Sequence, residues 1–175
     1  MEKKLAGLIV LIGAALGAHA QDKPENLKIT WPPEYQWKIA TNQEDQKVHL
    51  IELIPYQENL DTWSIMGTMM SFKGVKGVPM SKAMNMMFEL AFQQAPKAKI
   101  TELEKDEKAV HPWVLFKIES PRFKNDKHPE SQLYYIVQGE SSLYANFVAI
   151  KEKKLSTAFI SKWRPVFKAG TLETK

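Results

Sequence analysis

Cysteine is absent from all 175 residues of the chain. No disulfide can form, so the folded state has to be stabilised by packing. A bacterial lipoprotein carries its lipid on a cysteine at the cleavage site, so an anchor of that kind is excluded as well.

Long hydrophobic runs are also scarce, and the sequence has one, residues 5–18. Lys3 and Lys4 precede this run and the small residues of the segment AHA, 18–20, end it, which is the pattern of a secretory signal peptide. The run is shorter than the ~20 residues that span a bilayer. We therefore expect residues 1–20 to be a signal peptide and the protein to be exported, periplasmic or secreted, with no integral membrane segment after cleavage.

Catalytic motifs are missing too. The sequence contains no GxSxG, no HExxH and no phosphate-binding loop ending in GK[ST]. Beyond the predicted signal peptide the histidines are His49, His111 and His128, and none has the spacing of a zinc site. The formal net charge of +4 comes from interspersed charges of both signs, which does not indicate a nucleic-acid surface. We therefore expect a non-catalytic protein that binds neither nucleic acid nor a cofactor.

Prolines near residue 32 divide the chain. A polar, loose arm at residues 21–30 precedes a single domain at residues 31–170, and residues 171–175 form a short tail. Runs rich in Val, Ile, Leu and aromatic residues predict strands in the domain at 47–55, late in 57–73, 111–120, 132–138 and 143–151. The segment at 99–108 alternates with charged residues, which predicts an exposed or edge strand. Amphipathic segments predict two helices, one capped by Ser81 and ending near residue 95, the other capped by Ser156 and ending near residue 170.

Several predicted strands are apolar on both faces. In the segment HPWVLFKIES, for example, Val114, Phe116 and Ile118 lie on one face while Trp113 and Leu115 lie on the other. A strand of this kind needs cover on two sides. The predicted fold class is therefore α/β (α+β), with a mainly antiparallel sheet and helices on both faces, an α/β/α sandwich.

Three segments carry a resemblance to a known family: WPPEYQW, IELIPYQENLDTWSIMGTMMSF and AFISKWRPVF. Their order and spaced aromatic residues resemble the PsbP-like family, named for the extrinsic subunit of photosystem II and shared with bacterial envelope proteins of unknown role. The likeness covers most of residues 30–170. It implies a PsbP-like sandwich and an accessory or binding role.

Every methionine except the first lies between residues 66 and 87. Thioether sulfur suits Cu(I), so an exported copper protein is the alternative function, with Met80, Met84 and Met87 on one side of the predicted helix and Met69 or Met70 nearby as ligands. The same side chains also suit an irregular core, which is the favoured interpretation, or an adaptable surface for a partner.

The predicted loop at 121–131 joins two strands and contains Arg122, Lys124, Lys127 and His128. Long connections often carry binding function, and these side chains favour a small anionic ligand or an acidic envelope protein. A solvated loop is the simpler interpretation of the same residues. The function predicted from the sequence is a non-catalytic binding or accessory module of the bacterial envelope, with its oligomeric state left open.

Overall fold

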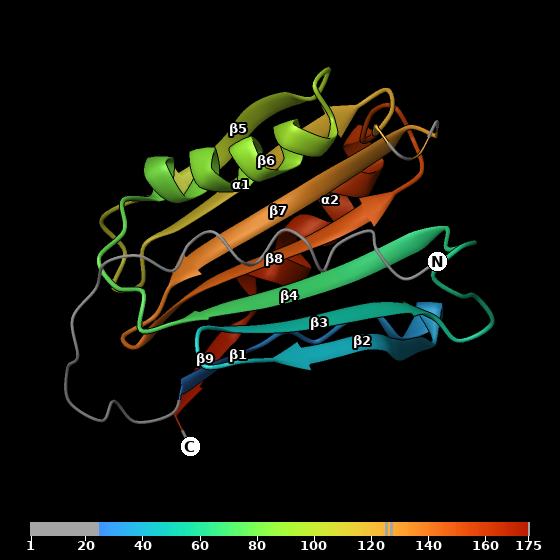
Figure 1. Ribbon diagram of the computed structural model, residues 1–175. Coiled ribbons are helices and arrows are strands. Elements are labelled where there is room, and N and C mark those ends of the chain that lie inside the picture. Colours follow the sequence, from blue (N-terminus) through green and yellow to red (C-terminus); the bar gives the residue numbers. More distant parts are fainter. Residues whose placement is uncertain (1–24, 125, 127, 175) are drawn as a thin grey trace.

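The computed structural model describes residues 25–124, 126 and 128–174, so the predicted signal peptide lies outside the described residues. A seven-stranded antiparallel sheet in the order β2-β3-β4-β8-β7-β6-β5 forms its centre (Figure 1). In chain order the elements are β1 (Glu25–Lys28), the 3-10 helix η1 (Pro33–Tyr35), β2 (Trp37–Glu44), β3 (Val48–Pro55), β4 (Ile65–Lys73), α1 (Met80–Gln94), β5 (Lys99–Asp106), β6 (Trp113–Ser120), β7 (Glu130–Gln138), β8 (Ser142–Ile150), α2 (Thr157–Lys168) and β9 (Thr171–Thr174).

The mainly antiparallel sheet is confirmed, but the predicted α/β class and α/β/α sandwich are wrong. Strands make up 45% of the described structure and helices 20%, with only two α-helices, which is a β-rich fold. Neither helix forms a layer: α1 lies over β6 and β7, and α2 is a single helix behind the sheet (Figure 1). The prediction failed because apolar strand faces show only that something covers them, and here much of that cover is not helical.

The sheet face under α1, called the α1 face, holds the larger core. Val114, Phe116 and Ile118 of β6 point into it, as the alternation in the sequence predicted. The helix contributes its buried stripe to the same core, namely Met80, Ala83, Met87 and Ala91. This stripe follows the helical period of 3.6 residues, which is why one side of α1 is buried against the sheet.

The opposite face, called the α2 face, is covered largely by aromatic residues. Trp163 and Phe167 of α2 are completely buried there against strand residues such as Leu115. Trp31, from the segment before η1, packs edge-on against Trp163 with ring centroids 5.7 Å apart. Its ring lies directly on Gly67 of β4, where a Cβ atom would overlap it. The cover of this face is therefore an irregular aromatic segment together with one helix.

The two ends of the described chain pair with each other. β1 and β9 form a separate two-stranded antiparallel sheet, with Leu27 opposite Leu172. Residues 25–28 belong to the segment predicted as a loose arm, and residues 171–174 to the predicted tail. Pairing and the burial of Leu27 hold both segments in place, which neither short polar segment indicates alone.

The helix starts differ in how well they were predicted. Ser156 caps α2 as expected, since its Oγ accepts a hydrogen bond from the Phe159 N–H at 3.1 Å. Ser81 is not the cap of α1, because that helix begins at Met80 and Ser81 lies in its first turn. The Glu107 carboxylate accepts from the Met80 and Ser81 N–H groups at 3.2 and 3.4 Å instead.

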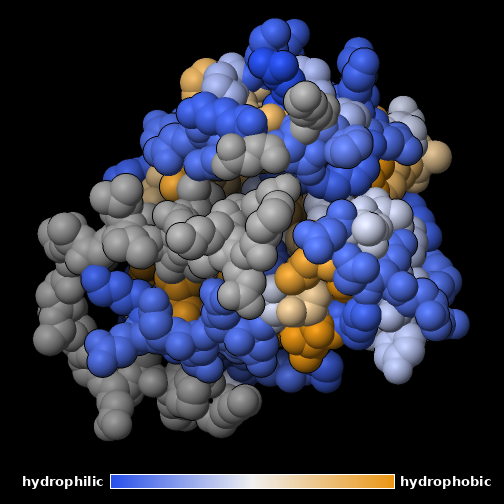
Figure 2. Space-filling view, turned by 45° about the vertical axis from the view of Figure 1, so that its right-hand side comes forward, coloured by the Kyte–Doolittle hydropathy of each residue, from blue (hydrophilic) through white to orange (hydrophobic). Residues whose placement is uncertain are grey.

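Hydrophilic residues dominate the side of the molecule in Figure 2, with hydrophobic side chains in smaller patches between them. The exposed large hydrophobic residues include Ile39, Tyr56, Leu60, Phe92 and Val110. Within the described ranges no helix is both long and apolar enough to cross a membrane.

Candidate functional site

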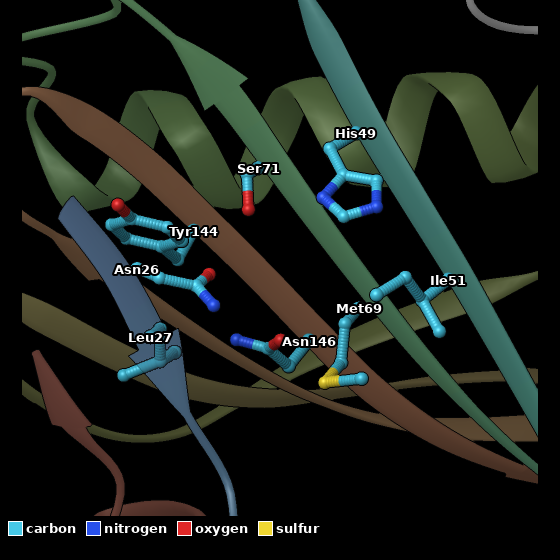
Figure 3. A pocket seen from close by; sticks show the side chains of 8 residues that line it. All are labelled: Asn26, Leu27, His49, Ile51, Met69, Ser71, Tyr144 and Asn146. Atoms are coloured by element: carbon cyan, nitrogen blue, oxygen red, sulfur yellow. The ribbon is translucent and has the colours of Figure 1, made fainter. Parts of the chain in front are cut away.

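A small hollow lies on the α2 face where β1 passes over the sheet (Figure 3). We call it the β1 hollow; it encloses about 50 Å3. Its lining comes from β1 and from strands β3, β4 and β8, and comprises Asn26, Leu27, His49, Ile51, Met69, Ser71, Tyr144 and Asn146. The lining combines three apolar side chains with five that carry polar groups.

Strand register explains why these side chains meet. His49, Ser71 and Tyr144 are direct partners across β3, β4 and β8. Ile51, Met69 and Asn146 form the neighbouring row, two residues along each strand. Because side chains alternate between faces with a period of two, both rows point to the α2 face. A polar row therefore lies beside a mostly apolar row.

His49 is half-buried, and one of its ring nitrogens contacts the Asn42 side chain. Its Nε2 lies 2.9 Å from Asn42 Oδ1, which is an acceptor, so Nε2 carries the proton in this contact. The other ring nitrogen, Nδ1, is then an acceptor in the neutral imidazole. Figure 3 shows a ring nitrogen directed toward Ser71 and the hollow.

Tyr144 closes the hollow on the β8 side. Its hydroxyl donates to the Glu25 carbonyl oxygen at 2.7 Å and lies 3.2 Å from the Glu25 carboxylate. Burial, together with the negative charge of Glu25, raises the pKa of Tyr144 to about 12. The phenol therefore stays protonated and ties β1 to the sheet.

Asn146 is the most unusual residue of the site. Its side chain is 2% exposed, yet Nδ2 has no hydrogen-bond partner among the residues that the structure describes. A buried polar group left unpaired costs about 1–3 kcal/mol. Figure 3 shows the amides of Asn26 and Asn146 directed into the space between β1 and the sheet. A hydrogen-bond donor thus faces the hollow at a cost in stability.

The size of the hollow limits what it can hold. A water molecule needs roughly 10–15 Å3 on this measure, so about 50 Å3 accommodates a group of a few non-hydrogen atoms. That is enough for one functional group and too little for a whole substrate. The chemistry available is hydrogen bonding by two amides, an imidazole and the hydroxyls of Ser71 and Tyr144, the second of which already donates to Glu25.

The predicted copper ligands are divided between the two faces of the sheet. Met80 and Met87 are buried in the core of the α1 face, at 0% and 3% exposure, and Met84 packs half-buried beside it. Met69 lines the β1 hollow on the other face of the sheet. Its neighbour Met70 points to the α1 face because strand residues alternate. Copper binding by a methionine cluster stays a prediction. Of the two alternatives for the fourth ligand, Met69 is not positioned to join the other three, whereas Met70 packs against the same core as they do.

The predicted binding loop contains an acidic residue, Asp126, which contacts one of the four predicted basic residues, His128. Arg122 and Lys124 are exposed, and Lys127 lies outside the described residues. Asp126 contacts the His128 ring at 2.8 Å and Lys151 at 3.1 Å. Partial burial would raise the pKa of Asp126, but hydrogen bonds from the His128 backbone and ring and from Lys151 hold that pKa well below its usual range. An anionic ligand for this loop stays a prediction.

The sequence did not single out the residues of the β1 hollow. His49 falls within the strand predicted at 47–55, and Met69 was predicted only as a copper ligand. Asn146 carried a signal, since it is an amide in the middle of the apolar run SLYANFVAI. No sequence pattern singles out Asn26, because it lies in a short polar segment.

Comparison with known proteins adds no relative. No protein-family model and no curated protein matches the chain. The resemblance to the PsbP-like family therefore stays a prediction from the sequence.

Proposed function

We propose that this protein is an exported, non-catalytic binding module of the bacterial envelope, and that the β1 hollow holds a functional group of its ligand. The observation that carries the proposal is the unpaired Nδ2 of the buried Asn146. Residues that lower the stability of a fold, with no local interaction to offset the loss, are typically found at functional sites. The predicted signal peptide supports the location.

Replacing Asn146 with leucine tests the proposal. The variant Asn146→Leu removes the unpaired donor, and the hollow offers room for the larger side chain. We expect the free energy of unfolding, measured by chemical denaturation, to rise by about 1–3 kcal/mol. In the unmutated protein, titration with a small alcohol, amide or carboxylate should shift the side-chain NMR resonances of Asn146, because at least one of these groups should enter the hollow.

Thr68→Val is the matched control. Thr68 is completely buried on the α1 face, and its Oγ1 is also without a partner among the described residues. We expect this variant to be stabilised in the same way but to keep the response to the small molecules, since Thr68 lies on the opposite side of the sheet. If no molecule shifts Asn146 and Asn146→Leu is no more stable than the unmutated protein, the β1 hollow is not a binding site.

A further inference from the structure

The hydrogen-bonding pattern of the β1 hollow narrows the class of ligand. Asn146 offers an N–H through its unpaired Nδ2, and Ser71 in the adjacent row has a hydroxyl. These two donors suit one acceptor atom on the ligand. His49 Nδ1 accepts, because Nε2 already donates to Asn42, and Asn26 brings an amide oxygen from β1. These two acceptors suit two N–H groups.

Charge around the hollow disfavours an anion. The lining contains no lysine or arginine. The Glu25 carboxylate lies 3.2 Å from the Tyr144 hydroxyl at one border. A ligand group with a full negative charge would be placed near the Glu25 carboxylate without a cation among the lining residues to neutralise it.

Apolar surface continues from the hollow along the α2 face. Ile51 and Met69 are half-buried strand partners in the lining. Leu53 is the next residue of β3 on this face, and its partner on β2 is Ile39, which is 60% exposed. A ligand whose polar group enters the hollow can place a short aliphatic body on this strip.

We propose that the β1 hollow binds a neutral carboxamide group carried on a short aliphatic chain. The amide carbonyl accepts from Asn146 Nδ2 and the Ser71 hydroxyl, while the amide NH2 donates to His49 Nδ1 and the Asn26 carbonyl oxygen. The aliphatic chain lies over Ile51 and Met69. Both a small free amide and a glutamine or asparagine side chain of a polypeptide present this chemistry. This inference rests on the proposed function and names the ligand class of the same site.

The test compares propionamide with propionate and 1-propanol, which share the ethyl group and differ in the polar group. Each is titrated into the purified protein, and the resonances of Asn146 and His49 are followed by NMR. We expect propionamide to bind at least about tenfold more tightly than propionate, since a carboxylate has no N–H for His49 and Asn26. The shifts of the His49 resonances should be lost in Asn146→Leu and retained in Thr68→Val.

The results separate the two proposals. Tighter binding of propionate or 1-propanol than of propionamide overturns the carboxamide inference and leaves the β1 hollow as a binding site. No binding by any of the three overturns the inference and, without a stability gain in Asn146→Leu, the proposed function as well. Repeating the titration with a glutamine-containing tripeptide distinguishes the sources: binding at least as tight as that of propionamide identifies a polypeptide side chain, and loss of binding identifies a small free amide.

Discussion

Glu52 is a single acidic residue in an otherwise mostly apolar strand, β3. It is 5% exposed and points to the α1 face, directly opposite Thr68 of β4. Burial raises the pKa of Glu52, and the nearby Glu130 carboxylate raises it further, against a hydrogen bond to the Thr41 side chain that lowers it. The folded protein therefore favours the protonated form of this carboxyl.

The raised pKa makes the stability of the protein depend on pH. The folded state holds the Glu52 proton more tightly than the unfolded state. The contribution of this proton to the stability of the protein is therefore fully present at pH values below 4.5, the ordinary pKa of a glutamate, and is lost as the pH rises through the pKa of Glu52 in the folded state. Glu52→Gln removes this dependence. We expect the stability of the variant relative to the unmutated protein to increase between about pH 4 and about pH 7.

Urea denaturation at a series of pH values measures this difference. Glu152→Gln, which removes a carboxylate from an exposed position, is the control and should show no comparable trend. A constant difference between Glu52→Gln and the unmutated protein across the range would show that the Glu52 pKa is not raised.

Among the elements, α1 has an unusual start. Its N-cap position is Pro79, which has no side-chain hydrogen bond to offer, and the first turn of the helix contains no acidic residue. Glu107, from the turn between β5 and β6, accepts hydrogen bonds from two of the free N–H groups. A negative charge at a helix N-terminus also interacts favourably with the helix dipole. A distant residue thus performs the function of a local cap.

Glu107→Gln keeps the shape of the side chain and removes its charge. We expect the free energy of unfolding to fall by about 0.5–1 kcal/mol, because the charge no longer interacts with the N-terminus of α1. The measurement is chemical denaturation at low ionic strength, and added salt should reduce the difference.

Glu89→Gln serves as the control at the helix itself. Glu89 is exposed near the middle of α1, so the same loss of charge is expected to change stability by much less. Equal effects of the two substitutions would show that Glu107 does not stabilise the N-terminus of α1.

At the scale of the whole molecule, contacts between distant parts of the chain complete the fold. β1 and β9 pair although they lie at opposite ends of the described sequence. The Glu25 carboxylate of β1 accepts from the Glu140 N–H at 3.0 Å, in the turn between β7 and β8. The β1 hollow exists only because these contacts hold β1 over the sheet.

Leu172→Ser tests the dependence of β1 on β9. Leu172 faces Leu27 in the small sheet and packs against the core of the α2 face. We expect the substitution to cost about 1–3 kcal/mol and to increase amide hydrogen exchange in β1 more than in β7 or β8. Propionamide binding should weaken in parallel, since Asn26 lies on β1.

Thr171→Ser is the control, because Thr171 is an exposed residue of the same strand. It should leave exchange in β1 unchanged. Unchanged exchange in Leu172→Ser as well would mean that β1 is held without β9.

Local sequence patterns were sufficient to predict the type and position of most helices and strands. The alternation in β6 predicted which residues face each core, because side-chain direction in a strand depends only on residue number. The exposed charges of the segment at 99–108 predicted an edge strand, and β5 lies at the edge of the sheet. The strand β2 was not predicted, since WKIATNQE combines few apolar residues with a bulge between Ile39 and Thr41.

Local sequence patterns are enough to establish the cysteine-free, packing-dependent character of the protein, its antiparallel hairpins and its helical segments. The cover of each face of the sheet, the cap of α1 and the residues of the β1 hollow depend instead on contacts made in the folded chain. The reason is physical: side-chain periodicity and turn chemistry act over a few neighbouring residues, whereas Asn26, His49, Ser71 and Asn146 come together through pairing and packing of strands far apart in the chain.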